Sequence, residues 1–226
     1  MKRKDCMEAV IFDMDGLMID TERLAAEGWK KSAEKLGFSI DEGRISQIRG
    51  RNIADSRELF KNWYQGEVDY DRARAVRVAY VRDYMEKNGV PVKDGLVELL
   101  EYLREQKIPA AVATSTEREV VEKELGQAGV LPYFDAMVCG NEVSRSKPDP
   151  EIFLTAMKKV HADPKKCIVL EDSFNGIRAG AAAGSNVIMV PDMDQPSGEI
   201  RGLCFRVCSV LSDVIGVLEE EIPLKK

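Results

Sequence analysis

A short apolar run that ends directly in two carboxylates constrains this chain more than any other feature of its sequence. The run is Ala9-Val10-Ile11-Phe12, and Asp13, Asp15 and Gly16 follow at once. Such a run, bounded by acids and a glycine, is typical of a buried parallel strand that opens into a loop. Open α/β sheets bind their ligands at that edge. The two acids can therefore bind a hard cation through oxygen, and one of them can also attack phosphorus.

Three further polar clusters follow later apolar runs. For an isolated Asp-x-Asp pair, solvated acids at a strand end would be the better interpretation, and these clusters argue against it. They follow residues 110–113, 136–139 and 167–170, and they are Thr114-Ser115-Thr116, Ser146-Lys147-Pro148-Asp149-Pro150 and Glu171-Asp172-Ser173. If the runs are parallel neighbouring strands, their ends meet in one crevice that holds carboxylates, hydroxyls and one lysine.

The segments between these runs predict an α/β fold, a parallel sheet with crossover helices. Apolar residues recur at helical spacing over residues 96–103, 120–128 and 152–160, and residues 186–190 form a further apolar run. Strands that alternate with helices indicate βαβ units, which are right-handed in nearly all cases. We interpret the helical stripes as core packing and assign them no functional role.

Residues 21–89 break this alternation. They carry aromatic residues at helical spacing among many charges, and they contain no apolar run comparable to the strands. Their aromatic content argues against a disordered charged linker. The sequence therefore predicts a helical cap domain over residues 19–91, inserted into a catalytic core that consists of residues 1–18 and 92–226.

The composition excludes several classes of partner. The net charge of −6 and the pI of about 5.1 give no bulk attraction for nucleic acid or for an acidic membrane. No apolar run approaches the roughly 20 residues of a membrane span, and no signal-peptide pattern follows the first residues. We therefore expect a cytoplasmic protein that binds neither nucleic acid nor a membrane.

The cysteines favour free thiols in a reducing compartment. Their number is odd and they are scattered through the chain, at Cys6, Cys139, Cys167, Cys204 and Cys208. Cys204 and Cys208 alone suggest a metal pair. With one histidine, His161, and no second cysteine pair, we do not expect a zinc site.

Four motifs in order give the chain a resemblance to the haloacid dehalogenase-like hydrolases over nearly its whole length. The motif residues are Asp13-Met14-Asp15-Gly16, Thr114, Lys147-Pro148 and Glu171-Asp172-Ser173. Ordered motifs in the expected strand context are far more specific than any one of them. Within this family, the chain resembles the branch of β-phosphoglucomutase and sugar-phosphate phosphatases. The residues that indicate this branch are Asp20-Thr21-Glu22, Gly50 with Asp55-Ser56, and residues 147–153. The resemblance implies a Rossmann-like core with a helical cap inserted after the first motif.

The resemblance also implies a function: a Mg²⁺-dependent phosphatase that hydrolyses small phosphate monoesters, such as sugar phosphates or related metabolites, through an aspartyl-phosphate. Asp13 would be the nucleophile, and Asp15 the general acid and base. The implied Mg²⁺ ligands are Asp13, the backbone carbonyl of Asp15 and Asp172, with Glu171 as a further ligand or as a partner of the ligands. We expect a monomer that binds a small phosphorylated metabolite.

Other residues are implied to bind the substrate. The groups that would contact the phosphoryl group and offset its charge are the Thr114 hydroxyl, the Ser115 backbone N–H and Lys147. Arg49, Gly50 and Arg51 occupy the place of the family's cap recognition loop, where two arginines can bind a second anionic or hydroxylated part of the substrate. Surface charge is an equally good interpretation of the arginines. Trp29 could line the crevice, although an aromatic residue on a helix more often packs in a core.

Three other functions remain open. The runner-up is a hexose-phosphate mutase, but the mutases carry a histidine and an arginine where this chain has Ala25 and Ile53. Hydrolysis is therefore favoured, although Arg51 is close enough in sequence to replace the arginine. A haloacid dehalogenase needs neither Asp15 nor the metal-binding acids. A noncatalytic regulator with the same fold is the third, since fold does not establish function, but the complete motifs argue against it.

Overall fold

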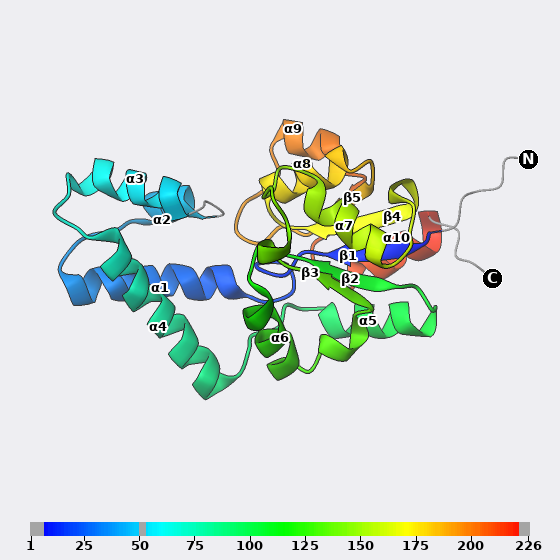
Figure 1. The fold of residues 1–226 in the computed structure, drawn as a ribbon, viewed down its shortest axis with the longest axis horizontal. Coiled ribbons are helices and arrows are strands. Elements are labelled where there is room, and N and C mark those ends of the chain that lie inside the picture. The colour runs from blue at the N-terminus through cyan, green and yellow to red at the C-terminus, as the bar shows by residue number, and fades with distance from the viewer. Residues whose placement is uncertain (1–6, 50–52, 222–226) are drawn as a thin grey trace, which may run out of the picture. The chain divides into compact units, whose positions relative to one another are not determined.

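The computed structural model describes residues 7–49 and 53–221, and the chain divides into two compact units. One unit consists of Met1–Ile19 and Val92–Lys226, and we call it the sheet unit. The other, Asp20–Pro91, is the helical unit. Figure 1 shows that the chain enters and leaves the helical unit once, between the first strand and the rest of the sheet unit.

The sheet unit is built on six parallel strands in the order β3-β2-β1-β4-β5-β6. The strands are β1 (Ala9–Phe12), β2 (Ala110–Ala113), β3 (Ala136–Val138), β4 (Cys167–Glu171), β5 (Asn186–Met189) and β6 (Arg206–Val207). The helices are α5 (Leu96–Glu105), α6 (Arg118–Gln127), α7 (Glu151–Lys159), α8 (Phe174–Ala182), α9 (Gly198–Leu203) and α10 (Asp213–Glu221). The predicted α/β fold with a parallel sheet is confirmed.

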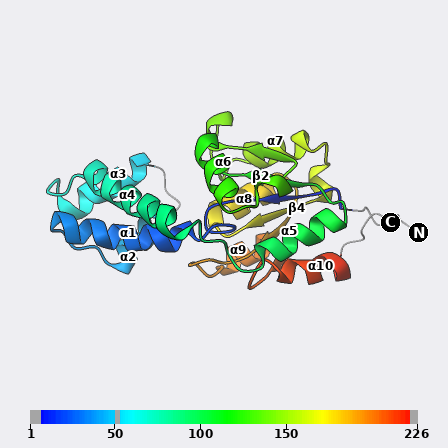
Figure 2. The same ribbon diagram turned by 90° about the horizontal axis from the view of Figure 1, so that it is seen from below.

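Helices cover both faces of this sheet (Figure 2). Alternate strand residues such as Ile11 and Val169 pack with α7 and α8 in one apolar core. Because side chains of a strand alternate between faces, Val10 and Phe12 point to the opposite face, on which α5 and α10 lie in Figure 2. The central strands β1, β2 and β4 are fully buried, so their sequences are apolar at every position up to the strand end.

The strand order brings the ends of β1, β2 and β4 together. β1 lies between β2 and β4, with Phe12 level with Val112 on one side and with Leu170 on the other. The chain builds the sheet outward from β1 in one direction through β2 and β3, and in the other through β4 to β6. The order therefore reverses beside β1, and ligands of open α/β sheets bind at such a reversal.

The helical unit packs its own aromatic core. Its helices are α1 (Thr21–Leu36), α2 (Glu42–Ile48), α3 (Ile53–Tyr64) and α4 (Tyr70–Asn88). Phe60 is fully buried, and its ring centroid lies 5.2 Å from that of Trp29 and 5.1 Å from that of Tyr70. Trp29 is only 6% exposed. Its place in this core supports the packing interpretation over a role in lining a crevice.

The two connections between the units run side by side. Ile19 and Val92 form an antiparallel bridge, the Asp20 N–H donates to the Pro91 carbonyl, and the Lys93 N–H donates to the Met18 carbonyl. In the sheet unit, the Lys93 ammonium also pairs with Asp192 at 2.7 Å, in the loop after β5. The second connection is therefore tied to the first through its backbone, and to the loop after β5 through the Lys93 side chain.

Four cysteines lie among the described residues, and all are free: Cys139, Cys167, Cys204 and Cys208. Burial raises the pKa of the Cys167 thiol to about 12 and that of Cys208 to about 11, so both are poor nucleophiles. Cys6 lies outside the described residues. Within residues 7–49 and 53–221, no helix is long and apolar enough to cross a lipid bilayer.

Candidate active site

Asp13 is the first residue after β1, and the sheet fixes its backbone. Its N–H donates to the Leu170 carbonyl of β4 at 3.1 Å, and the residue is only 7% exposed. The loop that follows turns back on itself, with the Gly16 N–H bonded to the Ile19 carbonyl at 2.9 Å. Gly16 has a φ of 81°, and a Cβ there would lie 2.4 Å from Asp172 Oδ2. Glycine is thus required both by the turn and by the close approach to Asp172.

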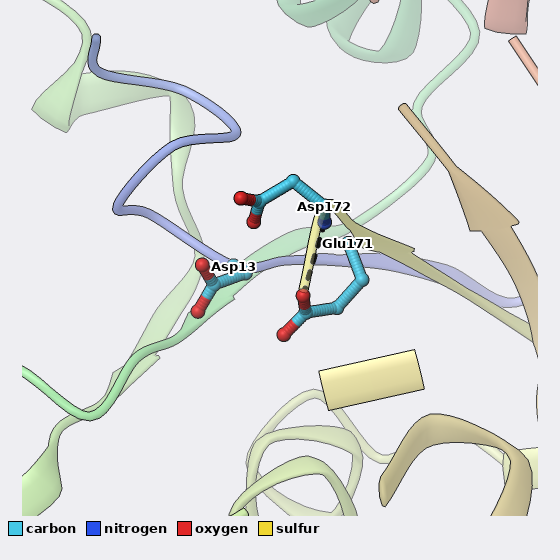
Figure 3. Close-up of side chains that lie close together, drawn as sticks. All are labelled: Asp13, Glu171 and Asp172. Atoms are coloured by element: carbon cyan, nitrogen blue, oxygen red, sulfur yellow. Dashed lines mark hydrogen bonds between the residues drawn. The ribbon is translucent and has the colours of Figure 1, made fainter. Parts of the chain in front are cut away.

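Glu171 and Asp172 stand at the end of β4. The Glu171 side chain is fully buried, and its Oε2 accepts from the Asp172 N–H at 3.0 Å and from the N–H and hydroxyl of Ser173 at 2.8 and 2.9 Å. A Cβ on Gly176, in the first turn of α8, would lie 1.6 Å from Glu171 Oε1. Figure 3 shows the three carboxyl groups gathered where β1 and β4 end, with the side chains of Glu171 and Asp172 turned in different directions.

Lys147 bridges two of these acids. Its ammonium lies 2.5 Å from Asp13 Oδ1 and 2.7 Å from Glu171 Oε1, and its side chain is 8% exposed. It also lies 4.7 Å from the centroid of the Phe153 ring. Burial disfavours the lysine charge, but the charges and hydrogen bonds of Asp13 and Glu171 outweigh it and raise the pKa of Lys147. Lys147 is therefore a fixed cation beside Asp13.

The loop that carries Lys147 is held from both sides. Glu151, the first residue of α7, accepts from the backbone N–H groups of Ser144 and Arg145 at 3.0 and 2.8 Å. Near the start of the loop, Arg118 and Lys159 both donate to the Met137 carbonyl and to the Glu142 carboxylate. The charge-assisted hydrogen bonds from Arg118 and Lys159 lower the pKa of Glu142 to about 2. These contacts fix the loop without using Lys147 itself.

The turn after β2, Thr114-Ser115-Thr116, faces Asp15. We call it the hydroxyl turn. Thr116 Oγ1 lies 2.6 Å from Asp15 Oδ2, and Thr114 Oγ1 lies 3.5 Å from the same oxygen. Thr114 is 1% exposed, whereas Ser115 is exposed. The loop after β1 is thus in contact with both neighbouring strand ends, through Gly16 on the β4 side and Asp15 on the β2 side.

Asp13, Glu171 and Asp172 form an acidic cluster whose donor set suits a divalent cation. One carboxylate oxygen from each of the three residues lies within 4.8 Å of the corresponding oxygens of the other two. Burial raises the pKa of Asp13, and the Glu171 charge adds to this effect while Lys147 opposes it. Three carboxylates beside one ammonium leave two uncompensated negative charges when all are ionised. Hard divalent cations such as Mg²⁺ prefer oxygen ligands and would offset that charge.

Most of the predicted site residues converge in the sheet unit: Asp13, Asp15, Thr114, Ser115, Lys147, Glu171 and Asp172. Arg49 lies in the helical unit, where its Nε is 3.6 Å from Glu22 Oε2 and its side chain is 13% exposed. The Arg49 side chain is therefore not a fully solvated surface charge, and its role in substrate binding stays a prediction. Gly50 and Arg51 lie outside the described residues.

Two residues of the site were not assigned by the sequence. Thr116 belongs to the hydroxyl turn that the sequence singled out, but nothing in the pattern separates it from Thr114. Glu124 lies on α6, and burial together with the charge of Asp15 raises its pKa to about 7. It is one of many acids on the helices of this sequence, so no local signal could have identified it.

Comparison with known proteins identifies the family. A family model described as haloacid dehalogenase-like hydrolase matches residues 10–190, which include every residue of the sheet-unit site. The chain belongs to this family. The predicted resemblance is thereby confirmed.

The curated relatives include phosphatases. A phosphorylated carbohydrates phosphatase of Thermotoga maritima is 35% identical over 192 residues, which cover 79% of this chain and 82% of the relative. A fructose-1-phosphate phosphatase of Escherichia coli is 28% identical over 181 residues, covering 80% of this chain and 95% of the relative. This chain is similar to both over most of their length.

Solved structures share the fold. A HAD family hydrolase of Deinococcus radiodurans with bound phosphate and sodium superposes with a TM-score of 0.77 at 25% identity, covering 94% of this chain and 96% of that one. A β-phosphoglucomutase of Clostridium difficile superposes with a TM-score of 0.74 at 22% identity, covering 95% and 96% of the two chains. At 22% identity, the similarity to the β-phosphoglucomutase shows only that the two chains share a fold.

Proposed function

We propose that this protein is a Mg²⁺-dependent phosphatase that hydrolyses small phosphate monoesters through an aspartyl-phosphate on Asp13. The enzyme class, a haloacid dehalogenase-like phosphoric monoester hydrolase, is confirmed by the family and by the phosphatases among its relatives. The observation that carries the mechanism is the setting of Asp13, a buried carboxylate with Lys147 2.5 Å away and two further acids within 4.8 Å.

The names of the relatives support a substrate class for this protein. The names of three of them state activity on phosphorylated carbohydrates, on fructose 1-phosphate and on a hexitol phosphate. We infer that the substrate is a small phosphorylated metabolite, with sugar and polyol phosphates as the first candidates. The helical unit would act as the cap that selects among them, since it is inserted directly after the loop that carries Asp13 and Asp15.

In the first step, Asp13 attacks phosphorus and the bond from phosphorus to the ester oxygen breaks. Two anions approach one another in this step, so it requires positive charge and hydrogen-bond donors. Lys147 supplies positive charge beside the Asp13 carboxylate. The Thr114 hydroxyl and the Ser115 N–H would donate to the phosphoryl oxygens. Asp15 gives its proton to the departing ester oxygen and becomes a carboxylate.

In the second step, water attacks the phosphorus of the aspartyl-phosphate. The Asp15 carboxylate takes a proton from this water, so the acid of the first step becomes the base of the second. The bond between phosphorus and the Asp13 oxygen breaks, inorganic phosphate leaves, and Asp13 is again a carboxylate. Asp15 ends the cycle protonated, ready for the next ester.

Asp13, Asp172 and the Asp15 backbone carbonyl would hold Mg²⁺. Bound there, Mg²⁺ would offset the charge of the phosphoryl group and of the acidic cluster. For Glu171 we favour a role as a partner, because its Oε1 accepts from Lys147 and its Oε2 already accepts from three donors. Glu171 would then keep Lys147 in place beside Asp13.

A phosphate-release screen tests the proposed function. The panel contains sugar phosphates, polyol phosphates and nucleotides, each assayed with Mg²⁺ and with excess chelator. We expect Mg²⁺-dependent release from sugar or polyol phosphates. If the protein releases phosphate from no member of the panel in Mg²⁺, the proposed function is wrong.

The metal requirement is expected to be strict, with Ca²⁺ a poor substitute for Mg²⁺. Ca²⁺ accepts 6–8 oxygen ligands at longer distances, so it can engage both oxygens of Asp13 and leave neither free to attack. Phosphate release in Ca²⁺ should fall by at least about tenfold relative to Mg²⁺, which corresponds to roughly 1.4 kcal/mol of activation free energy. Full activity in excess chelator would contradict the metal assignment of Asp172.

Hydrolysis is expected to exceed hexose-phosphate mutase activity. A mutase must return the phosphoryl group from Asp13 to a bound sugar before water takes it. Ala25 and Ile53 stand where the mutases carry a histidine and an arginine, and Arg49 lies beside Glu22. The test is incubation with β-glucose 1-phosphate and a trace of the 1,6-bisphosphate. Glucose 6-phosphate forming much faster than free phosphate would overturn this expectation.

A further inference from the structure

The carboxyl group of Asp15 has a close partner in the hydroxyl turn. Thr116 Oγ1 lies 2.6 Å from Asp15 Oδ2, a distance typical of a hydroxyl that donates to a carboxylate. Thr114 Oγ1 is 3.5 Å from the same oxygen, at the outer limit of a hydrogen bond. Of the two threonines, Thr116 therefore makes the stronger contact with Asp15.

The turn that carries Thr116 is fixed by its surroundings. The Thr116 N–H donates to Thr114 Oγ1 at 3.1 Å, and the Thr116 carbonyl accepts from the Gly140 N–H at 2.9 Å. A Cβ on Gly140 would lie 2.0 Å from the Ser115 carbonyl oxygen, so the chain after β3 packs directly against the turn. Thr116 thus presents its hydroxyl from a backbone that is held on two sides.

We propose that Thr116 is the positioning residue for Asp15, an inference that rests on the proposed function and deepens it. As the bond from phosphorus to the ester oxygen breaks and the bond to Asp13 forms, the Asp15 proton passes to the ester oxygen. Asp15 is left as a carboxylate, and the Thr116 hydroxyl donates to it. The hydrogen bond would stabilise the charge that forms on Asp15 in that step.

A hydroxyl suits this role because it both donates and accepts. It donates to Asp15 when Asp15 is a carboxylate, and by rotating it accepts from Asp15 when Asp15 is protonated. Lysine or arginine at this position could only donate and would favour the carboxylate alone. Thr116 can therefore stay bonded to Asp15 through both halves of the cycle.

Leaving-group dependence distinguishes this role from a structural one. Proton donation matters when the departing oxygen is a poor leaving group, as in glycerol phosphate, and matters little for 4-nitrophenyl phosphate. The rate constant kcat/KM covers substrate binding and the transfer of the phosphoryl group to Asp13, so it includes the acid step and leaves out hydrolysis of the aspartyl-phosphate. Thr116→Val keeps the shape of the side chain and removes the hydroxyl, and Thr116→Ser restores a hydroxyl.

For Thr116→Val we expect kcat/KM to fall by about 10- to 100-fold with glycerol phosphate and by less than about threefold with 4-nitrophenyl phosphate, within the range that general acid catalysis contributes. Thr116→Ser should recover most of the lost rate. The matched control is Thr155→Val on α7, the same exchange outside the site, which should leave both substrates unaffected. An equal loss with both substrates, or no loss with either, would overturn the inference.

A second measurement tests the positioning role of Thr116 without an activity assay. In crystal structures of wild type and Thr116→Val, Asp15 should lie against Thr116 in the first and move to another rotamer in the second. An unchanged Asp15 in the variant would refute the role of Thr116. A wild-type enzyme that hydrolyses no phosphate ester would refute the proposed function, and the position of Asp15 in the two crystal structures would still decide whether Thr116 holds it.

Discussion

Asp13→Asn is expected to abolish phosphate release while the protein stays folded. The amide keeps the shape of the side chain but is not a nucleophile, so no phosphoryl group is transferred to residue 13. The fold should survive because Lys147 keeps its 2.7 Å ion pair with Glu171. Loss of a nucleophile costs orders of magnitude in kcat, and we expect at least about 10³-fold here. The measurements are steady-state phosphate release and a thermal melt of each protein.

Two further variants sharpen this test. Asp83→Asn makes the same exchange at an exposed position of α4 and should retain wild-type activity. Asp15→Asn keeps the nucleophile but lacks the acid and base, so it should form phosphoenzyme slowly from good leaving groups and fail to hydrolyse it. Near-normal phosphate release by a well-folded Asp13→Asn protein would remove the covalent mechanism from consideration.

The sheet and the convergence of the site could be predicted because both depend on local pattern. The central strands are buried on both faces, so they read as unbroken apolar runs, and the polar clusters mark where those runs end. The sequence does not predict strand β6. It has two residues, both exposed, and so carries no periodic or apolar signal.

The partners of individual side chains could not be predicted. The sequence left Glu171 as either a ligand or a partner of the ligands, and only the structure gives it Lys147, Ser173 and the Asp172 N–H as donors. Arg49 and Glu22 are 27 residues apart, and no rule of helix spacing brings them together. Thr116 and Asp15 are about a hundred residues apart and meet because β1 and β2 are neighbours in the sheet. Tertiary pairing of this kind leaves no trace in local sequence.

Lys147→Met is expected to damage both stability and activity. The ammonium lies between Asp13 and Glu171, whose side chains are 10% and 0% exposed, so its loss leaves two buried carboxylates without their cation. Removing one partner of a buried ion pair typically costs about 3–5 kcal/mol. For a chain of this size each kcal/mol lowers Tm by about 2–4 °C. A fall of roughly 6–20 °C in a metal-free melt is therefore expected.

The activity of Lys147→Met should fall by about two to three orders of magnitude, the usual cost of removing a group that offsets transition-state charge. Lys158→Met is the matched control, since Lys158 is exposed on α7 and the exchange is the same. Adding Mg²⁺ should restore part of the lost stability, because a bound cation offsets the same carboxylates, but it should not restore the rate. If Lys147→Met has the same Tm as Lys158→Met and keeps its activity, Lys147 is not the cation on which Asp13 depends.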